Sequence, residues 1–237
     1  MQYKFILAAL VASPLVAAHG KVSVVTGDAG GNGTALGIQG AVVPGAGSNS
    51  KTEVDTTVFG STKVATDGLG RTTGNGKNTV ADATAAMAAS GSTLPQVSAS
   101  NGTLTGTVHI VTTDGAGPYS AIVDSTGTGA FSTGTKATVT TQVPGKNGNI
   151  SPNGTVRRLL ARMGLMKRAA NVNKDFPIAV SIPAGTTCSG TVGGQSGVCL
   201  VKIANSNPAG PFGGVVAIQM AGAAAGNTTT AAKKFKA

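Results

Sequence analysis

The chain has 237 residues, 36 of them glycine, and carries 18 Lys and Arg against 8 Asp and Glu, a formal net charge of +10. This charge favours an anionic polymer or surface as partner. An aromatic content of 3% without Trp disfavours a platform that stacks nucleic-acid bases or sugars. Glu53 is the single Glu and the seven Asp are scattered, so no carboxylate pair indicates a glycoside hydrolase.

Residues 1–18 are predicted to be a secretory signal peptide. Lys4 precedes an apolar stretch at residues 5–16, and Ala17-Ala18 is a small-residue end that signal peptidase accepts. Cleavage after Ala18 would make His19 the first residue of the mature chain. No later stretch reaches the roughly 20 apolar residues of a membrane span. We therefore expect a secreted monomer, extracellular or associated with the cell wall, with no membrane span and no nucleic-acid partner.

Residues 19–237 are expected to form one all-β domain. Short β-prone runs recur between Gly, Asn and Asp turns. We expect eight strands, at residues 22–25, 41–43, 105–112, 120–124, 137–143, 178–182, 198–203 and 214–220. Short, scattered strands of this kind predict an immunoglobulin-like or fibronectin-like β-sandwich.

Two long loop insertions interrupt the expected strands, at residues 45–103 and 145–174. The alanine-rich residues 79–89 of the first favour a short helix. In the second, residues 156–170 read as a short basic amphipathic helix. Its Leu and Met side chains either pack on the domain or contact a membrane surface or a partner. The dibasic pair Lys167-Arg168 is also a proteolysis site if the segment is exposed.

Cys188 and Cys199 are the two cysteines, and in a secreted chain we expect them to form a disulfide. The loop between them is rich in Gly and Ser, so its closure restricts the unfolded chain. A metal-binding role is the weaker alternative, because neither cysteine belongs to a CxxC pair. Five Asn-x-Ser/Thr sequons mark candidate glycosylation sites in surface loops, at Asn32, Asn101, Asn149, Asn153 and Asn227.

His19 and His109 are the two histidines, so chance alone would place one at the first mature position about once in a hundred. An N-terminal His offers a metal its α-amine and its imidazole, and the amine loses its proton near neutral pH. A second imidazole opposite them completes a three-nitrogen set that suits Cu(II). A lone strand histidine is more often structural, but its pairing with His19 favours His109 as a ligand.

Three segments together resemble the fungal histidine-brace proteins, whose best known members are lytic polysaccharide monooxygenases. These segments are His19-Gly20 after Ala-Ala, residues 109–119 with their Asp-Gly-Ala-Gly-Pro-Tyr end, and the Gly-Pro-Phe-Gly-Gly run at residues 210–214. Residues 176–190 and 198–219 resemble more closely the appressorium-associated virulence factors of pathogenic fungi, a secreted family described from powdery mildew infection structures. The chain is thereby similar to a family of fungal virulence proteins.

The resemblance implies one copper ion, bound by the amine and ring of His19 and the ring of His109. It places Phe212 on the axial face of the metal, although an ordinary core Phe is an alternative reading. Cellulose-active members carry a Gln two residues before an axial Tyr, where this chain has Gly210, so Gln219 or another group would have to position the oxidant. Asp114 and Tyr119 either shape the rim of the site or have ordinary structural roles.

Two functions follow as expectations. In the first, the reduced copper reacts with peroxide or oxygen and removes hydrogen from a sugar C–H bond of a wall polymer such as pectin. In the second, the protein is a virulence-associated binder of copper, of a cell-wall polysaccharide or of the host surface, without turnover. A Ser/His/Asp triad is not expected, because no Gly-x-Ser-x-Gly elbow is present.

Overall fold

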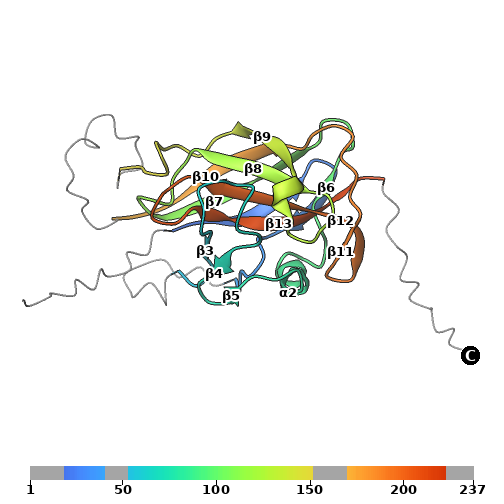
Figure 1. Ribbon diagram of the computed structural model, residues 1–237, viewed down its shortest axis with the longest axis horizontal. Coiled ribbons are helices and arrows are strands. Elements are labelled where there is room, and N and C mark those ends of the chain that lie inside the picture. Colours follow the sequence, from blue (N-terminus) through green and yellow to red (C-terminus); the bar gives the residue numbers. More distant parts are fainter. Residues whose placement is uncertain (1–18, 41–52, 152–169, 223–237) are drawn as a thin grey trace, which may run out of the picture.

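The computed structural model describes residues 19–40, 53–151 and 170–222. Seven long strands dominate these residues (Figure 1), and each overlaps a strand expected from the sequence. They are β1 Gly20–Gly27, β7 Thr103–Thr112, β8 Tyr119–Asp124, β9 Thr135–Thr141, β10 Asn171–Ser181, β12 Gln195–Asn205 and β13 Phe212–Met220. The expected strand at residues 41–43 and the basic helix at 156–170, with Lys167-Arg168, lie outside the described residues.

The seven strands form a closed barrel. Hydrogen bonding follows the order β12-β8-β9-β10-β7-β1-β13, and a further pairing of β12 with β13 closes the ring. Neighbouring strands are antiparallel except β1 and β13, which are parallel. The all-β prediction is confirmed, but the expected sandwich of two separate sheets is corrected, because β1 and β13 pair on both edges and leave no break in the hydrogen bonding.

Shorter elements cover one side and one end of the barrel (Figure 1). The predicted helix is confirmed as α2 Asp82–Ala89, inside the first long loop. The other short elements are β2 Gly30–Gly33, β3 Thr57–Val58, β4 Arg71–Thr72, β5 Gly76–Lys77, β6 Gln96–Val97, the 3-10 turn η1 Phe131–Thr133 and β11 Gly190–Val192. The described part of the first loop insertion, residues 53–103, therefore packs against the barrel instead of extending from it.

Two apolar clusters explain why β12 carries four consecutive apolar residues, from Val198 to Val201. Val201 and Ile203 face the barrel interior with Val108 and Val216. Their alternating neighbours, such as Leu200, join a second cluster on the outer surface, beneath the first long loop and α2. A strand buried on both faces carries apolar residues at consecutive positions, in place of the alternation of a half-exposed strand.

The predicted disulfide between Cys188 and Cys199 is confirmed, with the two Cα atoms 4.8 Å apart. It ties the residues before β11 to β12. Among the described residues, no helix has the length and apolar character needed to cross a bilayer. Three of the sequons, at Asn32, Asn101 and Asn149, lie at exposed positions, whereas those at Asn153 and Asn227 fall outside the described residues.

Candidate metal site at the histidine end of the barrel

The register of β1 and β7 places the two histidines on one face of the sheet. Lys21 pairs directly with His109, and the carbonyl of His19 accepts a hydrogen bond from the backbone N–H of Val111 at 2.9 Å. Residues two apart on a strand share a face, so His19, Lys21 and His109 project to the same side. The structure thus brings together two residues that are 90 positions apart in the sequence.

The imidazole of His19 is almost fully buried, with 3% of the residue exposed. Its Nδ1 lies 2.8 Å from Oε2 of Glu53, but the contact lacks hydrogen-bond alignment, and Nδ1 has no hydrogen-bond partner. The ring of Phe212 lies beside it, with 5.9 Å between centroids and 31° between planes. A buried ring nitrogen without a hydrogen bond is costly unless another partner satisfies it, and a metal ion is such a partner.

The backbone nitrogen of His19 is also held in a defined place. It donates to Oγ1 of Thr112 at 2.8 Å, and that hydroxyl donates in turn to Oδ1 of Asp114 at 2.8 Å. Burial raises the pKa of Asp114, while the hydroxyl of Thr112 acts in the opposite direction. In the uncleaved chain this nitrogen is a peptide amide. Cleavage before His19 would turn it into an amine, which binds metals.

The ring of His109 is oriented by a carboxylate. Its Nδ1 lies 2.6 Å from Oδ1 of Asp175, the residue that faces it across the β7–β10 pairing. With Nδ1 in contact with Asp175, Nε2 is the ring nitrogen left for a metal. A carboxylate in this position fixes the tautomer of a metal-binding histidine and raises its basicity.

A buried ion pair holds the first long loop against the histidine face. Nζ of Lys21 lies 3.5 Å from Oδ2 of Asp55, and the other carboxylate oxygen accepts the backbone N–H of Gln39 at 2.7 Å. This anchoring brings Glu53, two residues earlier, to the ring of His19. The positions of Glu53 and Asp55 beside His19 and Lys21 could not be predicted from the sequence, where the acidic residues are scattered.

The remaining predicted site residues lie in different places. Asp114 is connected to His19 through Thr112, so it is close to the site but buried. Tyr119 is inside the barrel core, where its hydroxyl donates to the carbonyl of Gly115 at 2.7 Å and burial raises its pKa. It therefore does not form a rim. Gln219 is near the far end of β13 and its Nε2 donates to the carbonyl of Ser196, a position that excludes it from the histidines.

The histidine end of the barrel can bind copper only through three nitrogen atoms of His19 and His109. Within residues 19–40, 53–151 and 170–222, no three His, Cys, Asp or Glu side chains form a metal-binding group. A site here therefore depends on the backbone nitrogen of His19, added to its Nδ1 and to Nε2 of His109. Three nitrogens of this kind suit tetragonal Cu(II).

Comparison with known proteins identifies the family. Residues 17–213 match the Egh16-like virulence factor family. The chain belongs to this family. It is 40% identical over 224 residues to the appressoria-specific virulence factor GAS1 of Pyricularia oryzae, covering 94% of this chain and 80% of that protein. It is 41% identical over 125 residues to the appressoria-specific virulence factor GAS2 of the same fungus, covering 52% of this chain and 37% of that protein.

No solved structure matches the chain. The family match and the two relatives confirm the resemblance to appressorium-associated virulence factors. The matched region of the Egh16-like family begins just before His19 and reaches into β13. It thus includes both histidines, Asp175 and Phe212.

Proposed function

We propose that this Egh16-like protein is secreted and binds one copper ion through a histidine brace. The amine and Nδ1 of His19 and Nε2 of His109 would be its ligands. The observation that carries the proposal is the buried ring of His19, on the same sheet face as a second histidine; its Nδ1 lies 2.8 Å from the Glu53 carboxylate but makes no hydrogen bond. A structural histidine would be expected to use both ring nitrogens in hydrogen bonds.

The surrounding residues each support the donor set. The carboxylate of Asp175 orients the ring of His109. The hydroxyl of Thr112 holds the backbone nitrogen of His19 by a hydrogen bond, and the ring of Phe212 packs beside the His19 imidazole. A phenyl ring cannot bind a metal, so it keeps water from that side. Copper bound here would supply one-electron redox chemistry with oxygen or peroxide.

Two outcomes of copper binding are open to this site. One is oxidation of a cell-wall polysaccharide, for which the positive net charge favours an anionic polymer such as pectin. The other is copper binding without turnover in a virulence-associated protein at the cell wall or host surface. The position of Gln219 favours the second, because the expected donor for positioning the oxidant lies at the other end of β13.

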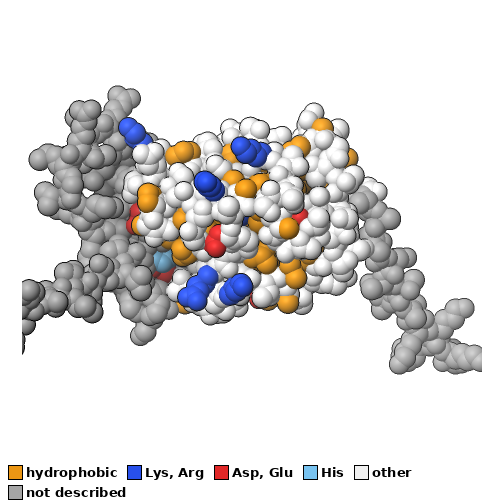
Figure 2. Space-filling view, viewed as in Figure 1, with side chains coloured by type: hydrophobic (Ala, Val, Ile, Leu, Met, Phe, Trp, Pro, Cys, Tyr) orange, Lys and Arg blue, Asp and Glu red, His pale blue; other side chains and the backbone are white. Residues whose placement is uncertain are grey.

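The described residues include eight Lys and Arg and eight Asp and Glu, so they carry no net charge. Figure 2 shows Lys and Arg side chains spread over the face rather than gathered in one patch. The basic cluster at residues 157–168, which the sequence predicts as a patch, lies outside the described residues. The positive excess of the chain therefore belongs to residues outside the described ranges, and we expect attraction to an anionic polymer through them to weaken as salt is added.

A copper titration tests the proposal. Protein that begins at His19 is compared by calorimetry with the same protein carrying one extra Gly before His19 and with His109→Ala. We expect tight 1:1 binding that both changes weaken by at least tenfold, since each removes one nitrogen ligand. Equal affinity for all three proteins would refute the brace.

Product analysis separates the two outcomes. Copper-loaded protein is incubated with a reductant and peroxide on pectin, chitin, glucan and cellulose, with His109→Ala as the control. Oxidised chain ends that require His109 would establish the enzyme. Copper binding without products on any polymer would establish the binder.

A further inference from the structure

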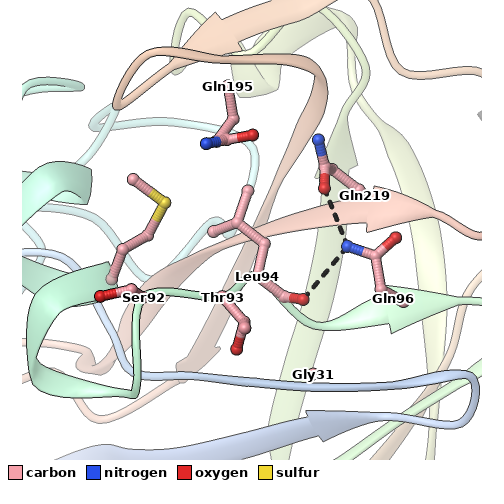
Figure 3. Close-up of a pocket in the computed structure, with 8 residues that line it drawn as sticks. Gly31, Ser92, Thr93, Leu94, Gln96, Gln195 and Gln219 are labelled. Atoms are coloured by element: carbon pink, nitrogen blue, oxygen red, sulfur yellow. Dashed lines mark hydrogen bonds between the residues drawn. The ribbon is translucent and has the colours of Figure 1, made fainter. Parts of the chain in front are cut away.

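A pocket of about 260 Å³, drawn in Figure 3, lies where β2, α2, β6, β12 and β13 meet. His19 and Phe212 lie at the start of the parallel strands β1 and β13, whereas Gln219 is near the end of β13. Seven residues of strand correspond to roughly 23 Å, so the pocket is separate from the histidines. Five segments contribute to its wall, through Gly31, Met87, Leu94, Gln96, Gln195 and Gln219.

Carboxamides dominate the polar lining of this pocket, and no charged side chain lines it. Two of them are fixed in orientation. Nε2 of Gln96 donates to Oε1 of Gln219 at 2.8 Å and to the carbonyl of Leu94 at 3.2 Å, as the dashed lines of Figure 3 show. Nε2 of Gln219 donates to the carbonyl of Ser196 at 2.8 Å. Both N–H groups of Gln96 are thus used, Gln219 keeps one N–H, and Oε1 of Gln96 is left as an acceptor.

The third carboxamide belongs to Gln195. Its side chain extends from β12 toward Leu94 (Figure 3), and no hydrogen bond to it is found among the described residues. It offers both a donor and an acceptor. Met87 and Leu94 provide apolar surface on the same wall. The pocket therefore combines a fixed acceptor, a free carboxamide and an apolar contact.

We propose that this pocket binds one neutral sugar unit, a hexose or an N-acetylhexosamine. Sugar hydroxyls donate and accept hydrogen bonds, as carboxamides do, and the C–H groups of a sugar ring pack on apolar side chains. A uronate or an amino sugar would bring a charge that the uncharged lining cannot compensate. The volume of about 260 Å³ is below that of most ligand pockets, which favours a single unit over a chain. This inference is independent of copper binding.

Two sources could supply the sugar, because a sequon lies beside the pocket. Asn32 is exposed, its backbone N–H donates to Oγ1 of Thr93 at 3.2 Å, and Thr93 lines the pocket. The sugar is then either the first unit of a glycan on Asn32 or the end of a glycan from the cell wall or host. Both present the same neutral chemistry.

An NMR titration tests the pocket. Unglycosylated protein is titrated with methyl glucoside, methyl galactoside and N-acetylglucosamine, and with glucuronate and glucosamine as charged comparators. We expect a neutral sugar to shift the side-chain amide signals of Gln96 and Gln195, with a Kd on the order of millimolar. The charged analogues should bind at least tenfold more weakly. No shift with any neutral sugar, or equal binding of the charged ones, would overturn the proposal.

Two variants locate the binding. Gln195→Ala removes a side chain without a hydrogen-bond partner in the described residues, so the fold should be kept while affinity falls at least fivefold. Thr191→Ala, on the adjoining β11 and outside the pocket lining, is the matched control and should bind as the wild type does. Unchanged sugar affinity of Gln195→Ala would overturn the assignment. The peptide triglycine is titrated as a further comparator, and signal shifts of the pocket residues with triglycine but with no sugar would also overturn it.

The source of the sugar is decided by glycosylation. Protein from a glycosylating host is compared with Asn32→Gln from the same host. If the glycan on Asn32 fills the pocket, added sugar will shift the Gln195 signal only in Asn32→Gln. If both proteins respond equally, the pocket takes an external glycan.

Discussion

Oδ1 of Asp175 lies 2.6 Å from Nδ1 of His109 and leaves Nε2 as the nitrogen that can bind a metal. The contact joins directly opposed residues of β10 and β7, so the strand pairing sets it. Asp175 has 69% of its side chain exposed. An exposed residue therefore sets the orientation of a candidate metal ligand.

Asp175→Ala should weaken copper binding without unfolding the protein. Removal of a carboxylate that orients a ligating histidine typically costs 10–100-fold in metal affinity, and the exposed side chain contributes little to packing. Calorimetric copper titration measures the change. Asp82→Asn, which removes a negative charge on α2, is the control and should bind copper normally. Equal affinities of the two variants would mean that Asp175 does not position a ligand.

Gly20→Ala should disrupt the histidine end of the barrel. A Cβ atom at residue 20 would lie 2.3 Å from the carbonyl oxygen of Gly115 and 2.5 Å from the hydroxyl of Tyr119. The backbone must shift to relieve this contact, at a cost of about 1–3 kcal/mol. Denaturant unfolding should show this loss, together with weaker copper binding, since Gly20 follows His19. Gly60→Ala, at a glycine without a positive φ where a Cβ would lie 3.3 Å from the nearest atom, controls for a general effect of Gly substitution.

Loss of the disulfide should destabilise the fold without affecting the histidines. The bond closes a short loop between residues 11 positions apart, which corresponds to roughly 3 kcal/mol on the chain-entropy model. The double variant Cys188→Ala, Cys199→Ala should lower the free energy of unfolding by about this amount in urea. Copper affinity should stay unchanged, and a parallel loss of copper binding would show that the two ends of the barrel are coupled.

Lys202 should make stability depend on pH above neutrality. Its amine is buried, 4.0 Å from the ring centroid of Phe59 and 5.5 Å from that of Phe131, and donates to the carbonyl of Thr66. Burial lowers its pKa to about 8, with Asp67 acting in the opposite direction. Between that value and the ordinary lysine pKa, the unfolded chain binds more protons than the folded one, so stability rises with pH.

The matching measurement is the Tm of wild type and Lys202→Met at about pH 7 and about pH 9.5. The wild type should gain at least about 3 °C more than the variant over this interval, since each kcal/mol corresponds to roughly 2–4 °C in a domain of this size. Below the folded-state pKa both states are protonated and no such difference is expected. Parallel pH profiles would contradict the shifted pKa.

The long strands could be predicted because their apolar, β-branched runs are bounded by turn residues. The closure of the barrel could not, because it depends on the partners that β12 and β13 choose across the sheet. The same limit applies to the site. His19 and His109 could be paired through their chemistry, whereas Glu53 reaches His19 only because Asp55 is anchored by Lys21.

Gln219 shows how a correct strand can still give a misplaced site residue. The strand at residues 214–220 was expected and is present in β13. Seven residues of extended chain nevertheless carry Gln219 roughly 23 Å from Phe212, into the carboxamide pocket. Residues that are close in the sequence of a strand can lie far apart in space, because a strand rises more per residue than a helix does.

A crystal structure of the processed chain, beginning at His19 and soaked with Cu(II), tests the central claim most directly. The account predicts one copper ion bound by the backbone nitrogen and Nδ1 of His19 and by Nε2 of His109, with Asp175 still on Nδ1 of His109. Copper bound by only one of the two histidines, or bound elsewhere while Nδ1 of His19 pairs with Glu53, would contradict it.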